Sequence, residues 1–357
     1  MSNESRGFLV LESGEVYEGL WKGGKSRAGE VVFNTSHSGY EEIATDPSYF
    51  SQIMVMTAPM QGNYGVDSQA WESNKMWIDG FVSLEMQNSV RDSAWSDQLA
   101  KSGIPILTDL DTRRIVMRLR DLGTPWGALV EAKTAEDAKK VASELILQKK
   151  KGDIDWVHQV SRKEVEIRKG TKSNGPRVAM IDYGVKENTL RELVAGSSEV
   201  AIFPSRTPER IIRDWAPDGL MLSNGPGNPQ DVKEAVETVK GLLGWKPMFG
   251  ICMGTQIMSL ALGAKTYKLP FGHRGGNHPV KDHLLNEIYV TSQNHGYCVD
   301  GSSLPSNARV THENLNDKTV EGIECKEKKC FSVQYHPESH PGPHDARKLF
   351  DFFLNGL

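Results

Sequence analysis

The residue best placed for nucleophilic chemistry is a cysteine that lies between two glycines. In PMFGICMGTQ, residues 247–256, an apolar strand enters, a helix leaves, and Gly250-x-Cys252-x-Gly254 joins them. This pattern holds a nucleophile on a sharp strand-to-helix turn, where side chains larger than glycine would crowd the neighbouring strands. The N-terminus of a helix also stabilises a thiolate. Taken alone, the pentapeptide fits a buried structural cysteine equally well.

A histidine and a carboxylate follow another apolar run, FSVQYHPE, residues 331–338. A free thiol has a pKa of about 8.5, so Cys252 needs a base, and a histidine base needs an acceptor that holds its ring. His336 and Glu338 supply both if the two strands run parallel and end at one edge. The alternative is a metal cluster of His336, His340 and His344 on one helix face. Three intervening prolines break that helix, and we expect no metal.

A glycine-rich loop, SNGPGNP at residues 223–229, follows a third apolar run. Its glycines allow backbone N–H groups to approach a ligand closely, as an oxyanion hole requires. The loop lacks the lysine of a P-loop and the G-x-G-x-x-G fingerprint, so it predicts no nucleotide site in this chain.

Composition excludes several classes of protein. The chain has 357 residues, 38% hydrophobic and 25% charged, which indicates a globular protein of two domains. Its 42 basic and 46 acidic residues give a net charge of −4, without the basic excess that nucleic-acid binding needs. With no signal peptide or apolar segment of membrane-spanning length, we expect no membrane partner and a cytoplasmic location. Four cysteines without a C-x2-C pair favour reduced thiols.

The first part of the chain mixes short strands with helices. Alternation around Ser13-Gly14 predicts a hairpin from Phe8 to about Trp21, and periodicity predicts helices over Thr112–Leu122 and Ala135–Leu147. Further strands are expected at Val31–Phe33, Ile53–Thr57 and Phe81–Leu84. A charged stretch with few apolar residues then predicts a linker, which places a first domain at 1–150, the linker at 151–175 and a second domain at 176–357.

The second domain alternates apolar runs with helical segments. Such βα alternation predicts a largely parallel sheet covered by helices, with its site at the carboxyl ends of the strands. The fold class is therefore α/β, with a mixed first domain. The expected pairs of strand and helix are Val178–Ile181 with Lys186–Val194, Val200–Phe203 with Pro208–Trp215, Gly219–Leu222 with Val232–Leu243, and Pro247–Ile251 with Gly254–Leu262. Later strands at Ile288–Thr291, Arg309–Thr311, Gly322–Cys325 and Phe331–Gln334 precede a last helix, Asp345–Leu354.

These motifs resemble the small, glutamine-hydrolysing subunits of carbamoyl-phosphate synthases over nearly the whole chain. SNGPGNP, GICMGTQ, SQNHGY and QYHPE resemble the class I (triad) glutamine amidotransferase domain. FGHRGGNHPV and the HPGPHD continuation resemble the synthase subunit in particular. In the first domain, GEVVFNTSHSGYEEIATDPSYFSQI and LTDLDTRRI resemble the domain that only this subunit carries.

The resemblance implies a role for each matching residue. Cys252 would be the nucleophile, His336 its base and then the acid for departing ammonia, and Glu338 the residue that orients the imidazole. The backbone N–H groups of Gly227 and Met253 would suit an oxyanion hole. Glutamine binding would fall on Ser48, Gly225, Gly227, Met253, Gln256, Asn294, Gly296 and Tyr297.

The resemblance also implies a partner. Ammonia would pass within a heterodimer to a large subunit, which makes carbamoyl phosphate for arginine and pyrimidine biosynthesis. ATP and magnesium would belong to that subunit, and this chain would need no cofactor of its own.

Two positions depart from the family pattern: Thr255 replaces the usual histidine of GICLGHQ, and Asn228 replaces the usual aspartate. One rival interpretation is a free-standing γ-glutamyl thiol hydrolase, for which the first domain is unneeded. Another is a catalytically silent regulatory subunit, against which the intact Cys252, His336 and Glu338 argue.

Overall fold

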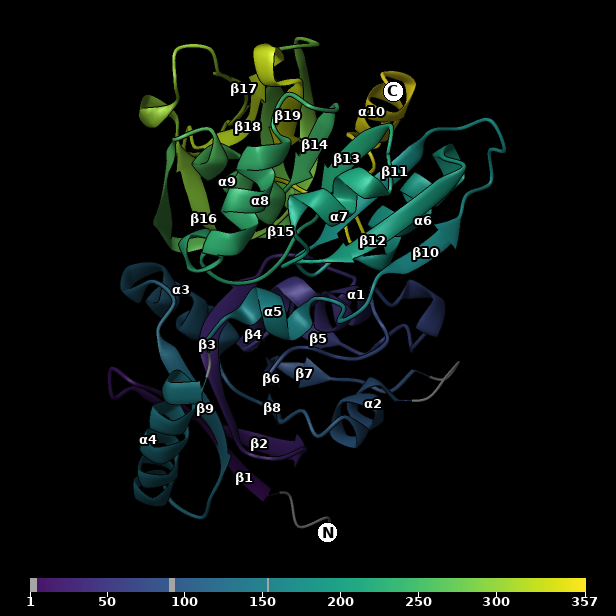
Figure 1. Ribbon diagram of the computed structural model, residues 1–357. Helices are drawn as coiled ribbons and strands as arrows, with labels where there is room; N and C mark the ends of the chain where they lie inside the picture. The colour runs from purple at the N-terminus through teal and green to yellow at the C-terminus, as the bar shows by residue number, and fades with distance from the viewer. Residues whose placement is uncertain (1–4, 90–93, 153) are drawn as a thin grey trace. The chain divides into compact units, whose positions relative to one another are not determined.

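The computed structural model describes residues 5–89, 94–152 and 154–357, and the chain divides into two compact units (Figure 1). Unit 1 comprises Met1–Ile154 together with Pro270–Arg274. Unit 2 comprises Asp155–Leu269 together with Gly275–Leu357.

Unit 1 is built around a closed barrel in the strand order β1-β2-β8-β6-β4-β3-β9. Its strands are β1 (Ser5–Leu11), β2 (Val16–Gly23), β3 (Arg27–Asn34), β4 (Gln52–Met56), β6 (Gly80–Val82), β8 (Ile106–Thr108) and β9 (Trp126–Glu131), with β5 (Met60–Gln61) and β7 (Glu85–Met86) as a separate parallel pair. Its helices are α1 (Tyr40–Thr45), α2 (Trp95–Lys101), α3 (Thr112–Leu122) and α4 (Ala135–Gly152).

The local predictions for unit 1 are confirmed where one segment determines its own structure. The hairpin β1–β2 and helix α3 lie where the pattern placed them. Asp111 caps α3 by accepting a hydrogen bond from the N–H of Arg114 at 2.9 Å, and Gly123 ends it with φ +87°. Helix α4 runs beyond the predicted end, through the lysine run to Gly152, because lysine is a good helix former and suits a helix C-terminus.

Unit 2 contains a ten-stranded sheet in the order β10-β12-β11-β13-β14-β19-β18-β17-β15-β16. Its strands are β10 (Glu166–Lys169), β11 (Arg177–Asp182), β12 (Glu199–Pro204), β13 (Gly219–Leu222), β14 (Met248–Ile251), β15 (Lys265–Asp282), β16 (Glu287–Asp300), β17 (Arg309–Asn314), β18 (Val320–Cys325) and β19 (Cys330–Val333). Strands β12, β11, β13, β14 and β19 are parallel, which confirms the predicted parallel sheet at its centre. Strands β10, β18 and β17 join antiparallel.

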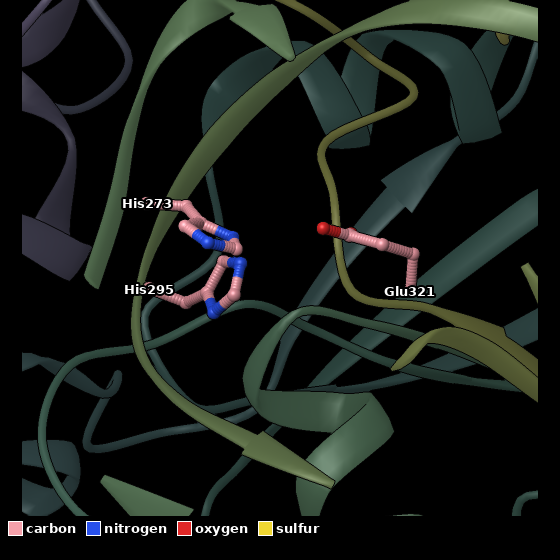
Figure 2. A group of neighbouring side chains, drawn as sticks. All are labelled: His273, His295 and Glu321. Atoms are coloured by element: carbon pink, nitrogen blue, oxygen red, sulfur yellow. The ribbon is translucent and has the colours of Figure 1, made fainter. Parts of the chain in front are cut away.

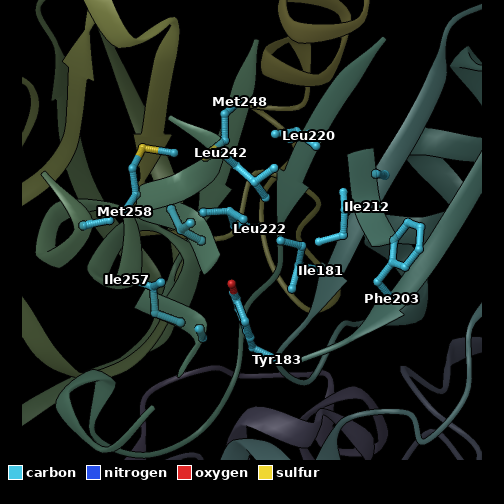
Figure 3. Close-up of a cluster of buried hydrophobic side chains, with 14 of the residues drawn as sticks. Ile181, Tyr183, Phe203, Ile212, Leu220, Leu222, Leu242, Met248, Ile257 and Met258 are labelled. Atoms are coloured by element: carbon cyan, nitrogen blue, oxygen red, sulfur yellow. The ribbon is translucent and has the colours of Figure 1, made fainter. Parts of the chain in front are cut away.

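Helices cover both faces of this sheet, as βα alternation requires. They are α5 (Trp156–Val160), α6 (Glu187–Gly196), α7 (Glu209–Asp214), α8 (Lys233–Leu242), α9 (Met253–Ala261) and α10 (Lys348–Asn355). Alternate strand residues point to opposite faces: Ile181 and Leu222 pack with α7, α8 and α9 (Figure 3), whereas Met180 and Phe249 pack with α6 and α10.

The range predicted as a linker contains two elements of unit 2. Helix α5 buries Val157 and Val160, and β10 pairs antiparallel with β12 at one edge of the sheet. A five-residue helix and a four-residue strand of alternating charge are too short to give a clear periodic signal.

Among the helices of the described residues, none combines the length and the apolar character that a bilayer crossing needs.

Candidate active site

The candidate site of unit 2 lies where four parallel strands end. Strand β11 leads to Lys186, β13 to the loop 223–229, β14 to Cys252 and β19 to His336. Because parallel strands end at the same edge of a sheet, segments far apart in the sequence meet there. The βα alternation predicted this edge as the site.

Cys252 occupies the predicted sharp turn. It has φ +53° and ψ −104° and is the N-cap residue of α9, and its own N–H donates to the carbonyl of Val333 at 2.9 Å. A Cβ on Gly250 would lie 2.9 Å from the carbonyl carbon of Gly254, and a Cβ on Gly254 would lie 2.4 Å from the carbonyl oxygen of Leu222. Steric exclusion therefore explains both glycines of the motif.

The Cys252 thiol is almost completely buried, with 1% of the residue exposed. Its Sγ atom donates to the carbonyl oxygen of Asn294 at 3.5 Å. The Nε2 atom of His336 has no hydrogen-bond partner among the described residues. That nitrogen is available to a reacting group.

His336 and Glu338 form the predicted pair. The Nδ1 atom of His336 lies 2.7 Å from the Glu338 Oε1 atom, and both side chains are buried. Burial works to lower the pKa of His336, but the Glu338 carboxylate and Cys252 outweigh it and raise that pKa to about 10. These neighbours favour the cationic form of the imidazole. The N–H of His336 donates to the carbonyl of Ser292 at 2.9 Å, which ties the segment after β19 to β16.

Lys186 and Asn188, which follow β11 in the chain, support Glu338. Neither of them was predicted from the sequence as a site residue. The Lys186 ammonium lies 3.4 Å from the Glu338 Oε1 atom and also donates to the Ser339 carbonyl. Asn188 donates to the Glu338 carbonyl at 2.5 Å. Burial works to raise the pKa of Glu338, but Lys186 and His336 lower it to about 2. A lysine four residues after the end of an apolar strand of the parallel sheet is the signal that could have pointed to Lys186.

The glycine loop and the first residue of α9 each present a free backbone donor. Among the described residues, neither the N–H of Gly227 nor that of Met253 has a hydrogen-bond acceptor. The loop is held by Asn224, which donates to the Gly184 carbonyl at 2.9 Å and accepts from the N–H of Lys186 at 3.3 Å. At Gly225, a Cβ would lie 2.2 Å from the carbonyl oxygen of Tyr183.

The remaining predicted glutamine-binding residues of unit 2 lie on α9 and β16. Gln256 Nε2 donates to the Tyr297 carbonyl at 2.9 Å and to the Gln334 side chain at 3.2 Å. Asn294, Gly296 and Tyr297 belong to β16, the strand whose Asn294 carbonyl accepts from the Cys252 thiol. Asn294, Gly296 and Tyr297 thus lie on the strand that contacts Cys252, and Gln256 lies on the helix that Cys252 caps.

Ser48 belongs to unit 1. Its N–H donates to the Asp46 Oδ1 atom at 2.8 Å, which caps the short 3-10 helix Pro47–Tyr49. The role of Ser48 in glutamine binding stays a prediction.

The two departures from the family pattern have clear structural partners. The Thr255 hydroxyl donates to the Val333 carbonyl at 2.6 Å and is completely buried. Asn228 accepts a hydrogen bond from the N–H of Gln230 at 3.1 Å and caps the 3-10 helix Pro229–Asp231. An asparagine oxygen meets this capping requirement as an aspartate would.

His295 and Glu321 are buried potential metal ligands of unit 2, and Figure 2 shows the Glu321 carboxylate pointing toward the His295 ring. His295 already hydrogen-bonds the Tyr297 carbonyl through Nδ1 at 2.8 Å and the Gln293 side chain through Nε2 at 3.0 Å. Glu321 accepts from Asn314 at 2.8 Å. His273, also drawn in Figure 2, belongs to the stretch Pro270–Arg274 of unit 1. That no metal binds stays a prediction.

Comparison with known proteins finds a family match in each of the two parts of the chain. Residues 9–129 match the family described as carbamoyl-phosphate synthase small chain, CPSase domain, and residues 179–355 match glutamine amidotransferase class-I. The carbamoyl phosphate synthase small chain of Symbiobacterium thermophilum is 46% identical to this chain and the match covers 96% of each protein. The chain belongs to the carbamoyl phosphate synthase small chain family.

Other small chains match as extensively. The small chain of Methanocaldococcus jannaschii is 44% identical, with 96% of each protein covered. A pyrimidine-specific small chain of Halalkalibacterium halodurans is 43% identical, with 97% of this chain and 95% of that protein covered. The predicted family and the predicted enzyme class, a glutamine amidotransferase subunit, are confirmed for this small chain.

A solved glutamine amidotransferase from Thermotoga maritima is 22% identical to the small chain, covers 45% of it and 76% of its own length, and has a TM-score of 0.37.

Proposed function

We propose that this small chain hydrolyses glutamine through a γ-glutamyl thioester on Cys252 and delivers the ammonia to a large synthase subunit. The observation that supports it most is the His336–Glu338 pair beside a cysteine on a sharp strand-to-helix turn. This arrangement combines a nucleophile, a proton carrier and a group that orients the carrier.

The reaction begins when the Cys252 thiolate attacks the side-chain amide carbon of glutamine. The tetrahedral oxyanion would accept hydrogen bonds from the free N–H groups of Gly227 and Met253. The His336 imidazolium gives its proton to the leaving nitrogen, the C–N bond breaks, and ammonia departs from a thioester. His336 then takes a proton from water, which attacks the thioester, releases glutamate and restores the thiolate.

The charges around His336 suit these proton transfers. Glu338 accepts from Nδ1 and leaves Nε2 for the thiol, the leaving nitrogen and the water in turn. Lys186 keeps Glu338 ionised, so the carboxylate stabilises the imidazolium without taking its proton. No metal or organic cofactor takes part in these steps.

The next step of the proposed function takes place on a different chain. The proposed partner is a carbamoyl-phosphate synthase large subunit, which would bind ATP, magnesium and bicarbonate and convert the ammonia to carbamoyl phosphate. We place this work in the cytoplasm. Its reducing conditions suit four cysteines that are all free and buried, including the cross-strand neighbours Cys325 and Cys330.

The test measures carbamoyl phosphate formation by the reconstituted complex of this chain with its large subunit. Cys252→Ser should lose synthesis from glutamine and keep synthesis from an added ammonium salt. Full synthesis from glutamine would remove Cys252 from the mechanism. A chain that hydrolyses glutamine but forms no complex would favour the free-standing hydrolase, and an active complex whose wild-type small chain hydrolyses no glutamine would favour the silent subunit.

A further inference from the structure

The carbonyl oxygen of Val333 connects the segment that carries Cys252 with the segment that carries His336. Val333 is the last residue of β19 and the register partner of Ile251 at the end of β14. Its carbonyl accepts two hydrogen bonds, from the N–H of Cys252 at 2.9 Å and from the hydroxyl of Thr255 at 2.6 Å. The chain reaches His336 three residues later.

Thr255 is suited to hold that carbonyl in place. Its side chain is completely buried in the first turn of α9, and a β-branched residue in a helix has few allowed rotamers. The hydroxyl has one proton, and the Gly250 carbonyl, its second acceptor, lies farther away at 3.4 Å. The proton therefore goes to Val333.

We infer that Thr255 is a positioning residue, whose hydroxyl fixes the end of β19 and thereby sets the placement of His336 against the Cys252 thiol. This inference rests on the catalytic roles proposed above. Thr255 touches neither the substrate nor the reacting atoms. It acts through the Val333 carbonyl. This carbonyl accepts a hydrogen bond from the N–H of Cys252, and Val333 lies three residues before His336.

The consequence concerns the chemical step more than glutamine affinity. Without the hydroxyl, the Val333 carbonyl keeps only the Cys252 N–H, and the segment that carries His336 gains freedom. A less firmly placed imidazole lies less often in line with the Cys252 thiol and the leaving nitrogen, so the chemical step should slow. Among the described residues, the Thr255 hydroxyl makes no hydrogen bond to those of β16 that are expected to bind glutamine, so glutamine affinity should change little.

The experiment compares three variants in steady-state glutamine hydrolysis by the full complex. Thr255→Val keeps the shape and removes the hydroxyl, and it should lower kcat about tenfold while KM stays within about twofold. Thr255→Ser keeps the hydroxyl and should restore most of the rate. Ser259→Ala is the matched control: it removes another completely buried hydroxyl of α9, one that donates to the Thr255 carbonyl at 2.8 Å, and should leave kcat unchanged.

A second readout follows the reactivity of the thiol. The rate at which iodoacetamide alkylates Cys252, taken as the difference from a Cys252→Ala blank, is measured in each variant. Thr255→Val should slow the alkylation, while Thr255→Ser and Ser259→Ala should match the wild type. If Thr255→Val does not fold, as thermal melting would show, Thr255→Ala removes the same hydroxyl with a smaller side chain.

The outcomes separate this inference from the proposed function. An unchanged kcat and alkylation rate in Thr255→Val, or equal losses in Ser259→Ala, would show that Thr255 has only a structural role. Hydrolysis retained by Cys252→Ala would instead overturn the proposed mechanism.

Discussion

The proposed nucleophile and the proposed base of this site are held in place by different sets of contacts. The elbow, residues 250–256, is fixed by backbone hydrogen bonds and by close contacts that exclude a Cβ at Gly250 and Gly254. The base segment, residues 333–339, is also held by backbone hydrogen bonds, but it adds buried charges, because His336 faces Glu338 and Glu338 faces Lys186. Close contacts distinguish one side, and buried charges distinguish the other.

In the proposed mechanism, this difference separates two requirements of thiol catalysis. The nucleophile needs an exact direction of attack, which a strained turn at Cys252 supplies without any ionisable neighbour on its own segment. The base needs a defined proton, which the buried charges supply by raising the pKa of His336 and lowering that of Glu338. Substitutions in the elbow and in the base segment should therefore change activity and stability in different ways.

The largest effect is expected on the elbow. Cys252→Ala should abolish glutamine hydrolysis, because the proposed mechanism has no second nucleophile. It should change the free energy of unfolding by only about 1 kcal/mol, since alanine is small and tolerates the same turn. Activity assays and denaturant unfolding measure the two quantities. Hydrolysis near the wild-type rate would remove Cys252 from the reaction.

The next effect is expected on the base segment. His336→Asn should lower glutamine hydrolysis by roughly 10²–10⁴-fold, the usual contribution of a general acid and base. The residual reaction would come from a thiol that loses its proton to water. Steady-state kinetics measure this effect, and a loss smaller than that caused by Glu338→Gln would mean that the two roles are reversed.

A pH effect follows from Glu338. Its pKa is lowered in the folded protein, from 4.5 to about 2, so its contribution to stability is complete above pH 4.5 and is lost as pH falls through about 2. Glu338→Gln cannot ionise and should lack this part of the acid destabilisation, on the order of a few kcal/mol. Unfolding free energies measured across this pH range in both proteins would show it. Parallel curves would contradict the charge-based account of the base segment.

The sequence predicted what short motifs determine by themselves. The glycine pattern around Cys252 describes one turn, and the His336–Glu338 contact joins residues only two positions apart. The βα alternation likewise predicted helices and strands whose periodicity is local, and the parallel centre of the sheet followed from chain connectivity. Each of these features depends on near neighbours.

The sequence did not predict features that depend on distant pairing. Lys186 meets Glu338 only because β11 and β19 end at one edge of the sheet. The barrel of unit 1 closes through the pairing of β1 with β9, which no local pattern specifies. The buried Thr255 hydroxyl has its nearer acceptor only because β19 lies beside α9 and presents the Val333 carbonyl there. Polar side chains at strand ends are the one signal that could have pointed to such contacts.

The smallest effect on activity is expected where the elbow and the base segment meet. Thr255→His introduces the residue usual in the family, and it should change glutamine hydrolysis about tenfold or less, or roughly 1.4 kcal/mol. A ring N–H can replace the hydroxyl as donor to Val333, and position 255 lies outside the line of attack. The larger ring enters a completely buried position, so the free energy of unfolding should fall by about 1–3 kcal/mol. Kinetics and denaturant unfolding of the same preparation test both expectations. A rise in activity of several orders of magnitude would show that Thr255 impairs the native chain, which would favour the regulatory interpretation over the catalytic one.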